Sequence, residues 1–159
     1  MTRQRLAVSR TETFAEAYGR LHPSLLRVVY LLTYDTSEAF DIVQDCFAEA
    51  YQRWDELDHP ESYLRRSAIN GAYRSMRDRS RRQVKHERQA RERSLNPRAP
   101  EYLADLIAAL PPKERAVVIL RFYLDLKTTE IADAVGMRPG SVGPTLTRAL
   151  RRLEKAIDP

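Results

Sequence analysis

The sequence predicts an all-α fold of two small helical domains joined by a basic linker. Apolar residues recur at three- and four-residue steps along most of the chain, and no strand-like alternation stands out. A polar, basic stretch at residues 81–100 interrupts this pattern and ends in the turn-forming sequence Asn-Pro-Arg-Ala-Pro. A helix-turn-helix pattern follows near the C-terminus. We therefore expect domains at residues 10–80 and 101–159.

The first domain is expected to contain three helices. The first begins near Phe14 and continues through a strongly apolar stretch at residues 25–32. His22-Pro23 is expected to kink or restart this helix, because proline disfavours helical conformation in the residue before it. Asp35, with an acidic residue three positions later, predicts the start of a second helix. Asp58-His59-Pro60 breaks the chain, and Pro60 lies in the first turn of the third.

The second helix has a clear apolar stripe, which predicts one buried face. Its members recur at three- and four-residue steps and are Ala39, Ile42, Val43, Cys46, Phe47, Ala50, Tyr51 and Trp54. Cys46 is the single cysteine of the chain, so no intrachain disulfide can form. A lone cysteine in this position usually behaves as a small buried hydrophobe.

The second domain is expected to open with a short helix that carries Leu103, Leu106, Ile107 and Leu110. Pro111-Pro112 ends this helix and starts the next. The helix-turn-helix completes the unit, with Ala132 at the close helix contact, Gly136 at the turn and Val142 as the apolar anchor of the second helix. A plain helical hairpin could also carry glycine at its turn.

The last helix combines an apolar side with a basic one, as expected of a helix in a DNA major groove. Ser141 is expected to cap its N-terminus, and Gly143-Pro144 to lie in its first turn. The apolar side is expected to contain Leu146, Leu150 and Leu153, and the open side Arg148, Arg151, Arg152 and Lys155. Groove contacts are expected from Thr145, Thr147, Arg148 and Arg151.

Two further faces differ in charge and indicate two different partners. The face of the second helix away from its stripe carries Asp41, Gln44, Asp45 and Glu49, and could dock a basic helix. The third helix presents aromatic, basic and amide side chains together, namely Tyr63, Arg66, Asn70, Tyr73, Arg74, Arg77 and Arg81. Rings and guanidinium planes stack on unpaired bases, so this face indicates single-stranded or melted DNA. Ordinary solvated helix faces are the alternative for both.

Several function classes are disfavoured by the composition. The 159 residues carry a net charge of +5, which suits a polyanionic partner. No phosphate-binding loop, dinucleotide fingerprint or metalloprotease motif occurs, and no histidine stands near Asp41 and Asp45 to complete a metal site. We expect no enzyme activity, cofactor or metal. Without a signal peptide or an apolar run long enough to span a bilayer, we expect a cytoplasmic protein with no membrane insertion.

Three segments, in this order, resemble a bacterial RNA polymerase sigma factor of the extracytoplasmic-function (ECF) class with regions 2 and 4 only. Residues 41–47 (DIVQDCF) are similar to the region 2 signature. Tyr63-Leu64 through Ala68-Ile69-Asn70, followed by Arg77, resembles the next part of region 2. Leu110-Pro111 through Glu114-Arg115, then Glu130-Ile131-Ala132, Gly136 and Arg148-Ala149, resembles region 4. The resemblance covers nearly the whole chain.

The resemblance implies a role for each face. It implies an alternative sigma factor that binds core RNA polymerase, recognises the −35 and −10 promoter elements and directs transcription initiation in the nucleoid. Polymerase contacts, to the β′ clamp helices, would come from Asp41, Gln44, Asp45, Phe47 and Glu49, with the β flap as a second polymerase contact. Contacts to −10 DNA would come from Tyr63, Arg66, Asn70, Tyr73, Arg74 and Arg77. Contacts to −35 DNA would come from Arg121, Ser141, Thr145, Thr147, Arg148 and Arg151.

Further implications concern the loops and the regulation. The loop at residues 55–60 would lie near a flipped base of the non-template strand, and the linker would thread through polymerase. An anti-sigma factor is an expected partner. Gly143-Pro144 departs from the family, which often has a basic residue and serine there, so −35 readout shifts to Thr147 and Arg148 or weakens. The alternatives are a stand-alone DNA-binding regulator, which needs neither the acidic face nor the Asn70 face, and a helical adaptor without a DNA role.

Overall fold

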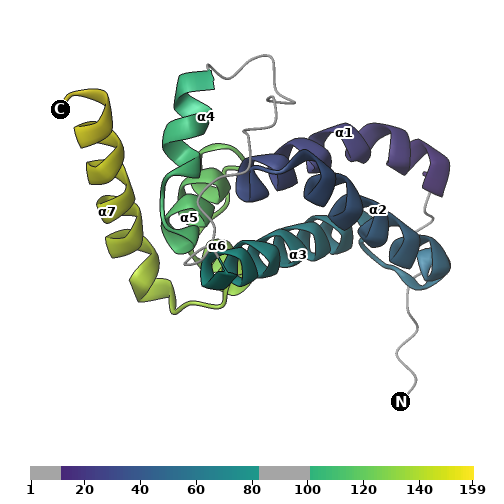
Figure 1. The fold of residues 1–159 in the computed structure, drawn as a ribbon. Helices are drawn as coiled ribbons and strands as arrows, with labels where there is room; N and C mark the ends of the chain where they lie inside the picture. The colour runs from purple at the N-terminus through teal and green to yellow at the C-terminus, as the bar shows by residue number, and fades with distance from the viewer. Residues whose placement is uncertain (1–11, 83–100) are drawn as a thin grey trace.

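The computed structural model describes residues 12–82 and 101–159, and all regular elements within these ranges are helical (Figure 1). Most of the expected linker at 81–100 lies outside the described residues. The first group of helices is α1 (Phe14–Thr33), α2 (Thr36–Gln52), the short 3₁₀ turn η1 (Trp54–Glu56) and α3 (Pro60–Arg82). The second is α4 (Glu101–Ala108), α5 (Pro112–Phe122), α6 (Thr128–Val135) and α7 (Pro139–Ile157).

Helix α1 is a single helix, so of the kink or restart expected at His22-Pro23 the restart does not occur. A capping box starts it: the Glu16 N–H donates to Thr13 Oγ1 at 3.2 Å, and the Thr13 N–H donates to Glu16 Oε2 at 3.1 Å. Pro23 lies inside the helix and cannot donate to the carbonyl of Gly19. Gly19 is exposed, so water can satisfy that carbonyl and the helix tolerates the proline.

The expected starts of α2 and α3 are confirmed. Asp35 is the N-cap of α2 and its carboxylate accepts from the Glu38 N–H at 2.9 Å, while α3 begins at Pro60. The apolar stripe of α2 is buried over most of its length, including Cys46. Tyr51 is the exception: it lies in the last turn and is exposed, with its ring packed edge-on against Phe14.

The helix-turn-helix is confirmed as α6, a turn and α7. Gly136 ends α6 at φ 66°, in the left-handed region that glycine adopts without a Cβ clash, and the Met137 N–H donates to the Ala132 carbonyl at 2.9 Å. Val142 is buried between the helices, as expected. The close contact and the turn therefore lie where the sequence pattern places them.

The start and the packing side of α7 differ from the prediction. The helix begins at Pro139, because proline suits the first helical position, so Ser141 is inside the first turn and is not the N-cap. Pro144 consequently lies inside the helix beyond its first turn. Ala149 is buried against Val118 of α5, whereas Leu150, the next residue along the helix, is exposed. The side of α7 that packs on α5 therefore carries the small Ala149 and not the expected Leu150.

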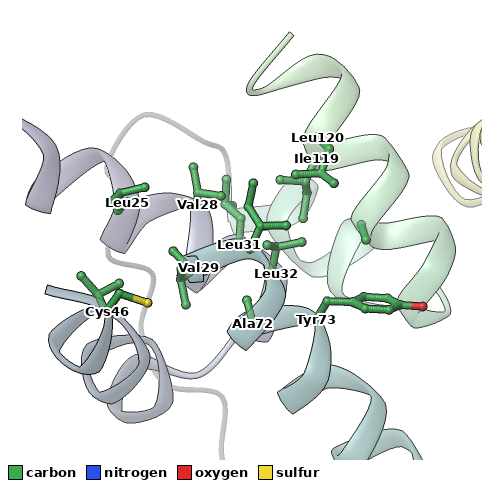
Figure 2. Close-up of a cluster of buried hydrophobic side chains, with 14 of the residues drawn as sticks. Leu25, Val28, Val29, Leu31, Leu32, Cys46, Ala72, Tyr73, Ile119 and Leu120 are labelled. Atoms are coloured by element: carbon green, nitrogen blue, oxygen red, sulfur yellow. The ribbon is translucent and has the colours of Figure 1, made fainter. Parts of the chain in front are cut away.

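The two groups of helices pack against each other. Helices α1 and α3 contact α5, and α3 also contacts α6. Most of the buried apolar side chains form one continuous cluster across both groups, in which Leu31 and Leu32 of α1 lie near Ile119 and Leu120 of α5 (Figure 2). Within the described ranges, no helix combines the length and apolar character that crossing a membrane requires.

Polar contacts also join the groups, around the C-terminal end of α1. Arg115 of α5 donates from Nη1 to the Leu32 carbonyl at 3.0 Å and from Nη2 to the carbonyls of Ala108 at 2.6 Å and Leu110 at 3.1 Å. The last turn of α1 contains no basic residue, and its carbonyls accept instead from Arg115 of the second group and from Arg79 of α3, whose Nη1 donates to the Thr33 carbonyl at 3.3 Å. Burial, and then the nearby charge of Arg79, lower the pKa of Arg115 to about 10.

Candidate functional site

The acidic face of α2 is exposed along its length. Asp41, Gln44, Asp45 and Glu49 all lie on the solvent side of the helix. The Gln44 side-chain amide donates to the Tyr18 hydroxyl of α1 at 3.3 Å. The carboxylates on this face form no ion pair that the described residues show, and no cluster suited to a metal ion occurs among them. This surface can attract a basic partner.

Phe47 lies beneath this face and not on it. Its side chain is only 2% exposed. Its ring packs edge-on against Tyr18 of α1, with centroids 4.8 Å apart, and against Phe14 at 6.2 Å. A partner cannot contact Phe47 in this arrangement, so its role is to fix α2 against α1. The same residue belongs to the apolar stripe, which was the sequence signal for its burial.

The predicted face of α3 is largely exposed. Arg66, Asn70, Arg74 and Arg77 are exposed and Tyr63 is half-buried. The Arg53 guanidinium lies over the Tyr63 ring, 5.6 Å from its centroid. This surface therefore offers three arginines, one amide side chain and one aromatic ring on neighbouring turns of one helix.

Tyr73 departs from the rest of this face, because the second group of helices covers it. Its side chain is 7% exposed, and Figure 2 shows its ring extending from α3 toward the C-terminal helices. Burial raises the pKa of Tyr73. Arg66 on the same face forms an ion pair at 3.8 Å with Asp133 of α6, but both side chains are exposed and the pair contributes little. Tyr73 cannot stack on a base while the two groups are packed in this way.

An open hollow lies beside the loop at residues 55–60. Its lining includes Arg20, Trp54, His59, Glu61 and Arg65. Arg20 is held by Glu12 at 2.8 Å and by Glu61 at 3.0 Å. The loop that the sequence resemblance places near a flipped base therefore forms one wall of a concave, polar surface with an aromatic side chain in it.

The expected −35 residues on α7 divide into exposed and buried side chains. Ser141, Thr147 and Arg151 are exposed. Thr145 is buried, and its hydroxyl donates to the Ser141 carbonyl at 2.7 Å. Thr147 likewise donates to the Gly143 carbonyl at 3.1 Å. Thr145 supports the helix from its packed side and does not face a groove.

Two arginines expected at the −35 surface are already engaged. Arg148 keeps most of its side chain exposed, but Nη2 donates to Thr145 Oγ1 at 3.2 Å and Nε lies 3.8 Å from Glu114 Oε1. Arg121 of α5 is half-buried and donates to the Leu126 carbonyl at 3.1 Å. Neither guanidinium is fully available to DNA in this arrangement.

A buried carboxylate, Glu114, lies behind α7 and was not predicted as a functional residue. Glu114 is part of the region 4 resemblance, but the resemblance implies no role for it. Its side chain is 8% exposed and pairs with Arg148 and, at 3.0 Å, with Arg152. The available signal was its place in the first turn of a helix, where acidic residues are favoured, but its partners lie far along the chain.

Comparison with known proteins agrees with this geometry. Residues 17–82 match the family model "Sigma-70 region 2", and residues 101–153 match "Sigma-70, region 4". The chain is 34% identical over 152 residues to the RNA polymerase sigma-E factor of Streptomyces coelicolor, covering 91% of this chain and 85% of the relative. The sigma-E factor of Streptomyces antibioticus is 36% identical over 152 residues, covering 91% and 84%.

The chain is an ECF RNA polymerase sigma factor. It is a non-enzymatic polymerase subunit that directs promoter-specific transcription initiation. Its fold is similar to that of the sigma factor RpoE from Bartonella quintana, solved with the anti-sigma factor NepR, with a TM-score of 0.70, 20% identity and 91% and 96% coverage of the two chains. It is also similar to CnrH, solved with the cytosolic domain of CnrY, with a TM-score of 0.61, 20% identity and 91% and 87% coverage.

Proposed function

We propose that this sigma factor uses three separate faces, one for polymerase and two for promoter DNA. The observation that carries the proposal is the separation of charge. The exposed acidic face lies on α2, whereas most of the exposed arginines of the described residues lie on α3 and α7. Residues 10–80 serve as the polymerase and −10 domain, residues 101–159 as the −35 domain, and residues 81–100 as the tether between them.

The acidic face of α2 is the polymerase surface in this proposal. Asp41, Asp45 and Glu49 would repel the phosphate backbone of DNA, so their partner is a basic protein surface. Gln44 adds a side chain that can both donate and accept hydrogen bonds. The β′ clamp helices of core RNA polymerase are the partner that the family resemblance supports. The β flap would contact the second group of helices.

The α3 face and the neighbouring hollow serve the −10 element. Arg66, Arg74 and Arg77 follow the phosphates, and Asn70 is placed to read a base edge. Tyr63 offers a ring for stacking, and the hollow beside residues 55–60 would accept an extruded base. Tyr73 contributes to this surface only when the second group of helices moves away from α3.

Helix α7 serves the −35 element in the major groove. Thr147 and Arg151 lie on its exposed side, while Ser141 in its first turn is close to where a phosphate would sit. Gly143-Pro144 brings no basic side chain, so the arginines later in the helix provide the positive charge. Arg121 and Thr145 support the helix and its neighbours in this proposal.

Regulation by an anti-sigma factor is the remaining part of the proposal. The similar sigma factor RpoE was solved with the anti-sigma factor NepR, which supports an equivalent partner for this chain. The protein would act in the cytoplasm, bound to polymerase on the nucleoid.

The polymerase surface is tested by reversing one charge on α2. Asp45→Arg should lose most of its binding to purified core RNA polymerase in a pull-down, because it places a cation on the surface that meets the basic clamp helices. Asp158→Arg makes the same charge change at an exposed site beyond α7 and should bind as the wild type does. Circular dichroism would verify that both variants fold. Wild-type core binding by folded Asp45→Arg would exclude this face.

A further inference from the structure

A buried carboxylate, Glu114 of α5, pairs with two arginines of α7. Glu114 lies in the first turn of α5 and its side chain is only 8% exposed. Burying a carboxylate is costly unless a cation and hydrogen bonds compensate for the lost water. Two cations are present, since Glu114 Oε2 lies 3.0 Å from Nε of Arg152 and Oε1 lies 3.8 Å from Nε of Arg148, but both contacts are ion pairs without hydrogen-bond geometry.

Both arginines meet Glu114 through Nε, at the inner end of the guanidinium. Their side chains remain 60% and 61% exposed, so the outer parts of both groups lie at the surface. Arg148 has a second anchor, because its Nη2 donates to Thr145 Oγ1 at 3.2 Å. Thr145 is in turn fixed by its bond to the Ser141 carbonyl at 2.7 Å. The hydrogen bond to Thr145 therefore restricts the orientation of the Arg148 guanidinium, and the charge of Glu114 attracts it from the same side.

We propose that Glu114 is a positioning residue for −35 recognition, and that Arg152 joins Arg148 in contacting the DNA. The proposal rests on the −35 function proposed above for α7. In this proposal the charge of one buried carboxylate attracts the inner ends of two guanidinium groups and so leaves their outer edges for the groove. Specific contact between arginine and guanine requires two hydrogen bonds in one plane, so a fixed plane favours the correct base.

The charge of Glu114 has a second effect, opposite in sign. A negative charge behind the DNA-binding surface weakens the attraction between α7 and every phosphate, whatever the sequence. Glu114 should therefore lower affinity for all DNA while raising the preference for the correct −35 element. A carboxylate that only fastened α5 to α7 would raise stability and would support both kinds of binding equally.

The variant to test is Glu114→Gln, which keeps the size of the side chain and removes its charge. Holoenzyme would be reconstituted from core RNA polymerase and the full chain. Its affinity would be measured by fluorescence anisotropy for a promoter from upstream of the protein's own gene and for the same promoter with its −35 element scrambled. The ratio of the two affinities should fall by about threefold or more, a modest part of what a bidentate arginine contact provides. Affinity for the scrambled promoter should stay the same or rise.

A matched control separates the charge from its position. Glu154→Gln removes the same charge from an exposed position on α7 and should leave the ratio unchanged. Arg152→Ala should lower the ratio, as Glu114→Gln does. An unchanged ratio in folded Glu114→Gln holoenzyme, or an equal loss of both affinities, would overturn the positioning role. If wild-type holoenzyme did not distinguish the two promoters, the proposed −35 function would fail and this inference with it.

Discussion

Replacing Arg115 by methionine should weaken both groups of helices, although Arg115 belongs to the second. The guanidinium donates to three main-chain carbonyls, and one of them, Leu32, is in α1. Methionine fills a similar volume but donates no hydrogen bond. The three carbonyls would then lose their charged donor in a site that excludes most water.

The magnitude follows from these contacts. A hydrogen bond to a charged group contributes about 1.5–3 kcal/mol, and part of this is offset because the buried charge itself disappears. A net loss of about 3 kcal/mol in the free energy of unfolding is the expected result. Only one of the three acceptor carbonyls lies in α1. About 1 kcal/mol of the lost free energy of unfolding should therefore appear as destabilisation of the first group of helices. For a chain of this size, 3 kcal/mol corresponds to a fall of roughly 6–12 °C in the melting temperature.

The assay uses the single tryptophan of the chain as a local probe. Trp54 lies in η1 and packs against the first group of helices, so its fluorescence reports unfolding of that group. Circular dichroism reports all helices together. In urea, both transitions should move to lower concentration in Arg115→Met. Arg151→Met, which removes an exposed arginine of α7, should leave both unchanged. A Trp54 transition identical to that of the wild type would refute the coupling between the groups.

Two further predictions concern stability. Gly19→Ala should stabilise the protein by about 0.5–1 kcal/mol in urea unfolding, because alanine favours the helix and a Cβ there has open space. Gly71→Ala should gain less stability or lose some, because its Cβ would lie 3.0 Å from the Cγ2 of Ile42. Equal gains in stability at Gly19 and Gly71 would contradict this close packing of α2 on α3. Burial lowers the pKa of His22 below its ordinary value of 6.5, so the unfolded chain takes up a proton more readily than the folded one. The free energy of unfolding should therefore decrease as pH falls below about 6.5 toward the pKa of His22 in the folded protein. The decrease should be less steep in His22→Gln, and equal pH dependence of the two proteins would exclude His22 as the cause.

Local patterns were sufficient to predict most helices. The start of α2 at Asp35, the start of α3 at Pro60 and the turn at Gly136 each depend on a few neighbouring residues and a known backbone preference. The buried stripe of α2 depends only on helical periodicity. The exposed positions on α2 and α3 follow from the same periodicity, because the side opposite the buried stripe faces water.

Contacts between distant segments could not be predicted in this way. Periodicity assigns Tyr73 to the exposed face of α3, but packing of the second group of helices buries it. The partners of Glu114 lie more than thirty residues along the chain, on a helix whose orientation the sequence pattern does not define. Arg115 caps a helix of the other group. Each depends on how the helices are assembled, which local propensity does not specify.

Promoter-dependent run-off transcription tests the central claim most directly. Purified core RNA polymerase and the full chain would be combined with DNA from upstream of the protein's own gene. The account predicts discrete transcripts that require the protein, and that are lost with folded Asp45→Arg but retained with Asp158→Arg. An absence of specific transcripts from any upstream fragment, with duplex DNA binding intact and no association with core, would contradict the account and favour a stand-alone DNA-binding regulator.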